Sequence, residues 1–450
     1  MGGSPVLTGL LNAQTDLTWR NARSGSVDRT PGMDDDPAQA PSATWRDVPK
    51  TVMTLGLVSL LMDVSSELIH GLLPVFLTTV VGAGIVTIGL IEGTAEATAA
   101  ITKVFSGALS DRLRKRKLLV GIGYGLSAIT KPVFPLAGTA WQVLAARFVD
   151  RIGKGIRDAP RDALIADVTP AAIRGASYGL RQALDTIGAF AGPLLAVALM
   201  ALYANDFRSV FWWAALPAAL AVLLIVIGVR EPDESSAAPR GSWPIRGREL
   251  RQLSRSYWIV VATGAVFALA RFSEAFLVLK AQADGLPLAL IPLVYVLMNA
   301  IYAGVAMPAG ILSDRIGRSN VLMCGLMVLT AADLTLALAP GLIGTAIGVG
   351  LWGLYLGLSQ GLLSALVADT APSDLRGTAF GLFNLVTGGA LLVASLLAGW
   401  LWHAFGPQAT FAAGAAFSAL TVLMMLTALR PRGKGAVPMN RLQPPSPEGS

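Results

Sequence analysis

The sequence is poor in charged residues, cysteine and histidine, and each scarcity argues against a class of protein. Asp, Glu, Lys and Arg make up only 14% of the 450 residues, whereas a soluble domain carries about 25%. The single Cys324 excludes an intrachain disulfide. The chain has no phosphate-binding P-loop, no His-Glu-x-x-His motif and no Cys-x-x-Cys pair. We therefore expect no enzyme activity, no cofactor and no resident metal, and any driving energy must come from a solute or ion gradient.

What the chain has instead is long apolar runs, with 54% hydrophobic residues arranged in blocks. Blocks of about 18 or more apolar residues predict membrane spans. Such spans are helices, because lipid leaves backbone polar groups no partner outside their own segment. The sequence thus predicts an all-α membrane protein with twelve transmembrane helices in two pseudo-symmetric six-helix bundles. The predicted spans are 51–80, 84–109, 118–137, 141–167, 176–203, 210–229, 257–280, 289–311, 321–339, 342–367, 377–403 and 409–430.

Polar segments divide the chain into five parts. Residues 1–48 and 431–450 are too polar to build a core, and we expect them to be disordered cytoplasmic tails. The bundles are expected at 49–229 and 256–430. They are joined by a cytoplasmic linker at 230–255 that is rich in Ser, Pro and Arg.

The basic residues lie in alternate loops. The net charge is +7, and the loop after the second span reads DRLRKRK, whereas the loops on the other side are nearly free of Lys and Arg. This asymmetry is typical of the positive-inside rule and does not indicate a nucleic-acid partner. We predict a multi-pass protein of the inner, or plasma, membrane with both termini in the cytoplasm.

Reporter fusions test this topology. Fusions at residues 240 and 440 are expected to behave as cytoplasmic, because the basic loops flank both sites. Paired reporters, one active only inside and one only outside, provide the measurement. An external signal at either site would reverse the predicted orientation.

The two halves contain an internal repeat. GALSDR at 107–112 recurs as GILSDR at 310–315, and LIADVTPAAIRGASYGL, from Leu164, recurs as LVADTAPSDLRGTAFGL, from Leu366. Two motifs repeated at nearly one offset indicate duplication of a six-helix unit. Duplication of this kind predicts a substrate site near the membrane midplane, between the halves.

These motifs resemble signatures of the major facilitator superfamily. The repeated loops resemble the signature that follows the second helix in this superfamily. The resemblance covers residues from about 50 to 430. The fourth span resembles the arginine–glycine signature, although Arg151 stands where glycine is common. The fifth span resembles a Gly-Pro signature that is commoner among exporters. The residues that carry these two likenesses are Arg147, Phe148, Gly153, Gly155, Gly188, Gly192 and Pro193.

The resemblance implies a cytoplasmic gate. In it, the Asp111 carboxylate would interact with nearby arginines and with a helix start in the other half, near 376–378, where free N–H groups favour an anion. Simple loop stabilisation is the alternative. The expected gate residues are Gly107, Asp111, Arg112, Arg161, Gly310, Asp314 and Arg315.

Ionisable side chains inside spans are candidates for function, because each costs at least about 2.5 kcal/mol at the bilayer centre. Asp63, Glu67 and His70 follow i, i+4, i+7 spacing and so share one helix face. We expect Glu67 to carry a coupling proton, with Glu96 as its competitor. Two alternatives stay open: the acids only pair with bases of the fourth span, or the first-span ligands carry a divalent metal ion. The proton-coupling candidates are Asp63, Glu67, His70, Glu92, Glu96 and Asp185.

Substrate contacts are expected from both halves. Arg151 and Lys154 are predicted about 15–20 Å deep in the fourth span, where an i, i+4 pair of Asp150 with Lys154 is expected. The same spacing predicts either a pair of Arg181 with Asp185 or a link from these residues to the first span. For the aromatic residues, ordinary packing is the alternative. The cavity candidates are Arg147, Asp150, Arg151, Lys154, Arg181, Arg271, Glu274, Tyr295, Asn299, Tyr355, Gln360 and Asn384.

These features predict a secondary active transporter that works by alternating access, is coupled to protons and exports its solute. Its expected partners are a small, anionic or zwitterionic substrate, protons and the lipid bilayer, and we expect a monomer. A divalent metal-ion transporter is one alternative. A non-transporting sensor or scaffold on the same fold is the other, and intact repeated gate motifs argue against it.

Overall fold

The computed structural model describes residues 48–113, 115–170, 173–229, 253–359, 367, 370–371 and 375–428, without the side chains of residues 108, 111, 314, 376 and 377. All of them lie in one compact unit, Ala43–Ser450. Every regular element in this part of the chain is a helix. Eleven of these described helices are long and apolar enough to cross a membrane. The remaining predicted span, α7 (Ala140–Val168), is equally long, but its charged residues lower its hydropathy.

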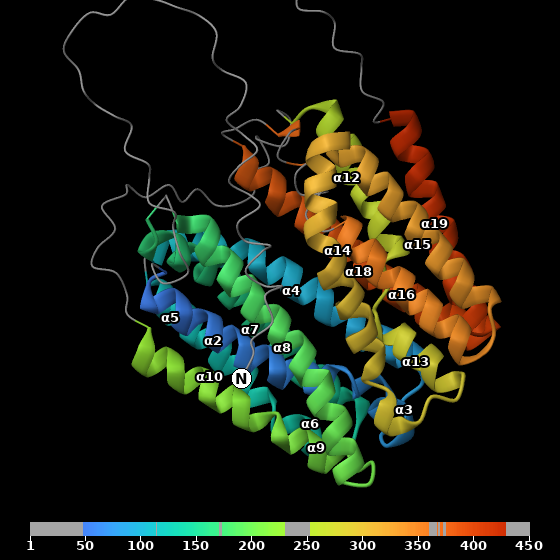
Figure 1. Ribbon diagram of the computed structural model, residues 1–450, viewed down its shortest axis with the longest axis horizontal. Helices are drawn as coiled ribbons and strands as arrows, with labels where there is room; N and C mark the ends of the chain where they lie inside the picture. Colours follow the sequence, from blue (N-terminus) through green and yellow to red (C-terminus); the bar gives the residue numbers. More distant parts are fainter. Residues whose placement is uncertain are drawn as a thin grey trace, which may run out of the picture. The chain divides into compact units, whose positions relative to one another are not determined.

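The first half forms the six predicted spans, several of them built from two helices (Figure 1). Their bounds are α2 (Lys50–His70) with α3 (Leu73–Thr79), α4 (Ile85–Leu113), α5 (Arg116–Thr130) with α6 (Val133–Leu136), α7 (Ala140–Val168), α8 (Arg174–Leu202), and α9 (Phe207–Trp213) with α10 (Ala215–Gly228).

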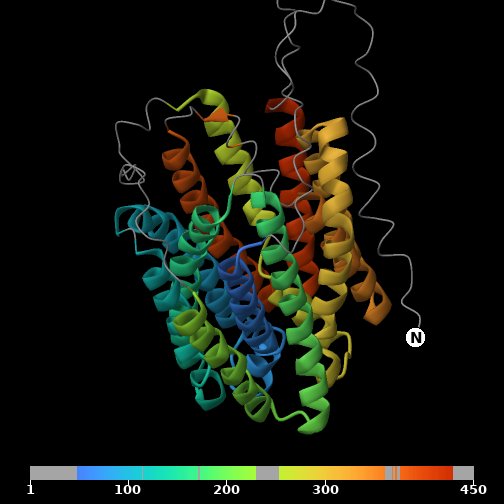
Figure 2. The same cartoon turned by 60° about the vertical axis from the view of Figure 1, so that its left-hand side comes forward.

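The second half repeats this arrangement. Its bounds are α12 (Arg255–Ala270) with α13 (Ala275–Ala283), η3 (Leu288–Leu290) with α14 (Leu293–Ile316), α15 (Arg318–Leu338), α16 (Gly341–Ser359), α18 (Arg376–Phe405) and α19 (Pro407–Ala428). The tenth span, predicted to reach residue 367, is described continuously only to Ser359. Figure 2 shows the long helices of both halves running side by side along one common direction.

Several spans that were predicted as continuous segments are broken into two helices in the structure. Pro74 starts α3 after the break in the first span, and Pro132 lies in the break of the third. Proline favours a helix start because it has no N–H to donate and clashes with the preceding turn. The seventh span breaks at residues 271–274 without a proline, so no such signal marked it in the sequence.

Close contact between α4 and α18 joins the two halves (Figure 1). A Cβ atom on Gly89 would lie 2.3 Å from the Ser395 carbonyl oxygen, and one on Gly399 would lie 3.0 Å from the Ile85 carbonyl oxygen. A Cβ atom does not fit at the first distance and would be tight at the second. Small residues are the usual means by which membrane helices approach each other closely. This contact holds the acids of α4 opposite α18.

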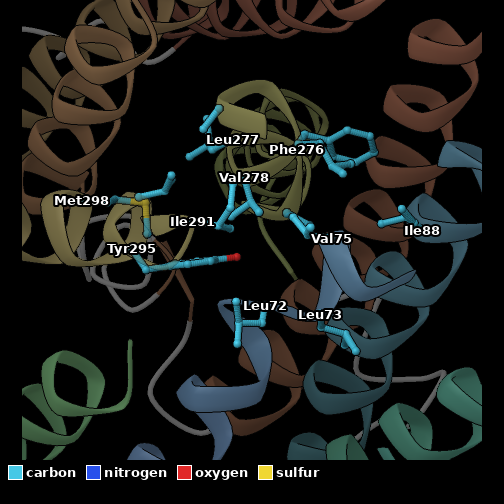
Figure 3. Close-up of a cluster of buried hydrophobic side chains, with 14 of the residues drawn as sticks. Leu72, Leu73, Val75, Ile88, Phe276, Leu277, Val278, Ile291, Tyr295 and Met298 are labelled. Carbon is cyan, nitrogen blue, oxygen red and sulfur yellow. The ribbon is translucent and has the colours of Figure 1, made fainter. Parts of the chain in front are cut away.

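The described apolar residues form one core shared by both halves and two cores that each stay within one half. Figure 3 shows the shared core, where Leu72 and Val75 lie opposite Val278, Ile291 and Tyr295. It lies toward the loops that the charge pattern predicts to be external. Toward the opposite end, one cluster around Tyr124 belongs to the first half and one around Tyr257 belongs to the second. The described packing therefore joins the halves at the predicted external end.

Candidate functional site

Two ion pairs join α4 to the charged helix α7. The Arg147 Nη2 atom lies 2.7 Å from Glu92 Oε2, and the Arg151 Nη2 atom lies 3.3 Å from Glu96 Oε1. Arg147 and Glu92 are almost fully buried, whereas the Glu96 side chain is 42% exposed. The i, i+4 spacing on each helix sets two acids against two bases. These two acids therefore pair with bases of the fourth span. This pairing was one of the interpretations left open by the sequence.

His70 lies between two carboxylates near the end of α2. Its Nδ1 atom is 3.6 Å from Glu67 Oε2, and its Nε2 atom is 3.5 Å from Glu92 Oε2. The ring of Tyr295, from the second half, lies 5.2 Å from the imidazole, centroid to centroid. Glu67, His70 and Glu92 thus form a line of three titratable groups from α2 to α4.

The Gly-Pro segment of α8 packs against the acids of α2. A Cβ atom on Gly188 would lie 2.9 Å from Asp63 Cβ, and one on Gly192 would lie 2.8 Å from Glu67 Cβ. One turn away, Arg181 and Asp185 form the predicted pair at 3.0 Å. The glycines therefore hold α8 close to two of the proton-coupling candidates.

The predicted pair of Asp150 with Lys154 is wrong. Asp150 Oδ1 instead lies 3.1 Å from Lys131 Nζ, which also donates a hydrogen bond to Ser66 at 3.0 Å. Lys131 lies at the junction of α5 and α6, and both members of the pair are buried. Lys154 is exposed and makes no ion pair with a described side chain. Helical spacing could not identify the partner, because a neighbouring helix supplies the base that the buried carboxylate needs.

The predicted gate residues that the structure covers do not join the ion pairs described above, and some of the predicted site residues lie outside the described part of the chain. Gln360 and the side chains of Asp111 and Asp314 lie outside the described residues. Arg161 contacts Ser59 at 3.0 Å and Tyr124 at 3.3 Å, both within the first half. The gate residues with described positions are Gly107, Arg112, Arg161, Gly310 and Arg315.

A cavity of about 110 Å³ lies where the two halves meet at the break in the seventh span. Ser273, in that break, donates a hydrogen bond to Glu92 Oε2 at 3.4 Å, and its backbone N–H donates to Ser395 Oγ at 3.3 Å. Five of the lining residues, all of them ionisable, are among the site candidates given above, whereas the two serines, which carry no charge to mark them, are not. The described lining residues are His70, Glu92, Glu96, Arg271, Phe272, Ser273, Glu274, Trp352, Leu391 and Ser395.

The remaining candidates do not line this cavity. Two of the second-half candidates contact residues that do line it. The Tyr295 ring contacts the His70 ring, and the Tyr355 ring packs edge-on against the Trp352 ring with a centroid distance of 5.5 Å. The candidates that lie elsewhere in the described structure are Asp63, Glu67, Asp185, Arg147, Asp150, Arg151, Lys154, Arg181, Tyr295, Asn299, Tyr355 and Asn384.

Trp352 is held in the cavity wall by a buried carboxyl group. Its Nε1–H donates to Asp333 Oδ1 at 3.0 Å, and Asp333 is fully buried with its Oδ2 atom lacking a partner among the described residues. The indole ring lies 5.8 Å from the ring of Phe272. This hydrogen bond fixes one orientation of the indole. No sequence pattern predicts it, because the two residues are 19 positions apart on different helices.

In the described part of the chain, no group of three or more His, Cys, Asp or Glu side chains is arranged to hold a metal ion. Asp63, Glu67 and His70 share a helix face, as predicted, but His70 comes within 4 Å of Glu67 and not of Asp63. The cavity can bind polar solutes through charged side chains, and the line of titratable groups can hold protons.

Comparison with known proteins places this arrangement in a family. The family model described as Major Facilitator Superfamily matches residues 55–393 and, in a second match, 281–447. The chain belongs to the major facilitator superfamily. An uncharacterised MFS-type transporter of Methanocaldococcus jannaschii is 34% identical over 388 residues, which cover 85% of this chain and 95% of that protein.

Other members of the superfamily are more distant. A class C tetracycline resistance protein of Escherichia coli is 27% identical over 317 residues, which cover 65% of this chain and 75% of that protein. The crystal structure of a nucleoside transporter covers 84% of this chain and 99% of its own, with a TM-score of 0.70 and 14% identity. At that identity the likeness shows the fold alone. This major facilitator protein is therefore a multi-pass membrane transporter, and its family is the one that its sequence motifs resemble.

Proposed function

We propose that this major facilitator protein is a proton-coupled exporter of a small organic solute, not an enzyme, and that it acts as a monomer in the inner membrane. The observation that carries the proposal is the line Glu67–His70–Glu92, which ends in the cavity between the two halves. Histidine changes charge near neutral pH, and neighbouring carboxylates can pass it a proton. The same line would bind a proton and sense the solute.

Alternating access would follow from the two bundles, 49–229 and 256–430, moving against each other about the cavity. The shared apolar core around Leu72 and Val278 would open, and the repeated loops at 107–112 and 310–315 would close. In this proposal both termini and the linker at 230–255 face the cytoplasm, as the loop charges indicate.

Export is the direction that the Gly-Pro segment of α8 and the resistance protein among the relatives both favour. Proton entry down its gradient would then drive solute outward. Proton and solute must compete for this to work, and the charged cavity offers the groups for that competition.

Proton flux in reconstituted liposomes tests the proposal. With an internal pH dye, wild-type protein is expected to move protons when a transported solute gradient is imposed. His70→Gln is expected to abolish that flux, because glutamine cannot carry a proton between Glu67 and Glu92. Asn320→Ala, on an exposed polar residue at the start of α15, serves as a matched control and is expected to keep the flux. Equal proton flux in His70→Gln and wild type would contradict the proposal.

A further inference from the structure

The charges that face the cavity are not equally available. Glu92 is paired with Arg147, and Glu96 is paired with Arg151. Arg271 and Glu274 line the same cavity, yet neither makes an ion pair within 4 Å with a described residue. The Arg271 Cζ atom lies 5.7 Å from the centroid of the Phe267 ring. The Arg271 guanidinium interacts with the neutral Tyr355 hydroxyl, and its charged neighbours are Glu274 and Glu96. One cation and one anion are thus left for a ligand.

Both free charges come from the break in the seventh span. Arg271 directly follows α12, and Glu274 directly precedes α13. A broken helix at the membrane midplane is a common way to present polar groups to a solute, because its backbone leaves the regular helical hydrogen-bonding pattern. Charged residues in such a position are costly without a partner. A ligand of complementary charge would remove that cost.

The opposite wall is apolar. Phe272, Trp352 and Leu391 line the cavity, and Asp333 holds the Trp352 indole in place through its hydrogen bond of 3.0 Å. The cavity volume of about 110 Å³ is smaller than the roughly 150 Å³ of a protein cavity that takes a benzene ring. The wall therefore suits a branched aliphatic group that is smaller than a ring.

From these contacts we infer that the solute is a small zwitterion with one apolar group. Its carboxylate binds the Arg271 guanidinium, its ammonium binds the Glu274 carboxylate, and its apolar group packs on Phe272 and Trp352. The role of this zwitterion in transport rests on the proposed function: when the protein is coupled to protons, the ammonium and a proton compete for Glu274. That competition is what exchange of one for the other requires.

A matched set of three probes tests the inference on purified protein without any proton gradient. L-Valine carries both charges, isovalerate only the carboxylate, and isobutylamine only the ammonium. L-Valine is expected to bind at least about tenfold more tightly than either of the others, about 1.4 kcal/mol. Thermal shift at neutral pH, followed by titration calorimetry, provides the affinities.

Three variants assign the two charges. Arg271→Gln is expected to weaken L-valine binding to the level of isobutylamine and to leave isobutylamine binding unchanged. Glu274→Gln is expected to weaken L-valine binding to the level of isovalerate. Arg255→Gln, at an exposed arginine at the start of α12, is the control and is expected to bind as wild type.

Equal affinity for the three probes, binding of none of them, or a uniform loss for all probes in Arg271→Gln would overturn the inference. Because binding is measured without a gradient, these outcomes are independent of proton coupling. A zwitterion that binds but moves no proton would contradict the proposed function alone.

Discussion

Glu67→Gln is expected to abolish transport that is driven by a proton gradient and to preserve exchange of solute across the membrane without a gradient. Glutamine matches glutamate in shape but cannot release a proton, so the transport cycle loses its driving step while solute binding persists. Glu67 lies 3.6 Å from His70, which connects it to the cavity. Gradient-driven flux should fall to the level of protein-free liposomes.

Two measurements on the same liposomes separate these effects: net flux under an imposed pH gradient, and exchange of labelled for unlabelled solute. Asp63→Asn is the matched control, because Asp63 shares the face of α2 but makes no ion pair within 4 Å with a described residue. Its effect should be milder. If Glu67→Gln still moves solute against its gradient, the assignment to Glu67 is wrong, and Glu96 becomes the next carboxylate to test.

Arg147→Met is expected to destabilise the folded protein strongly, by about 3–5 kcal/mol, because it removes the guanidinium from the buried Glu92 carboxylate and leaves only the more distant His70 and Ser273. Glu92 is 1% exposed and lies 2.7 Å from Arg147, and its Oε1 atom has no hydrogen-bond partner among the described residues. The double variant Glu92→Gln with Arg147→Met should recover much of the loss, since it removes both charges.

Arg151→Met offers a control on the same helix, one turn further along. Its partner Glu96 is 42% exposed, so water can solvate the carboxylate that remains. The melting temperature and folded yield in detergent should drop for Arg147→Met and hold for Arg151→Met. Equal melting temperatures of the two variants would show that the buried Arg147–Glu92 pair contributes no more to stability than the exposed one.

The sequence by itself determined the class and the layout of the molecule. Apolar blocks of sufficient length predict spans because lipid enforces helices there, and the superfamily is confirmed by the family match. The i, i+4 spacing of Arg181 and Asp185 predicted a pair that the structure contains at 3.0 Å. Patterns within one helix are readable because helical geometry relates near neighbours in the chain.

Only the tertiary structure decided which charges are bound and which are available. Asp150 pairs with Lys131 across helices, although helical spacing had indicated Lys154. Arg271 and Glu274 gained their position from a helix break that no proline announced. Partners of buried charges come from whichever helix packs nearby, and packing in the membrane depends on the fit of side-chain shapes between helices. That fit is a property of three-dimensional contact, and no spacing along one helix contains it.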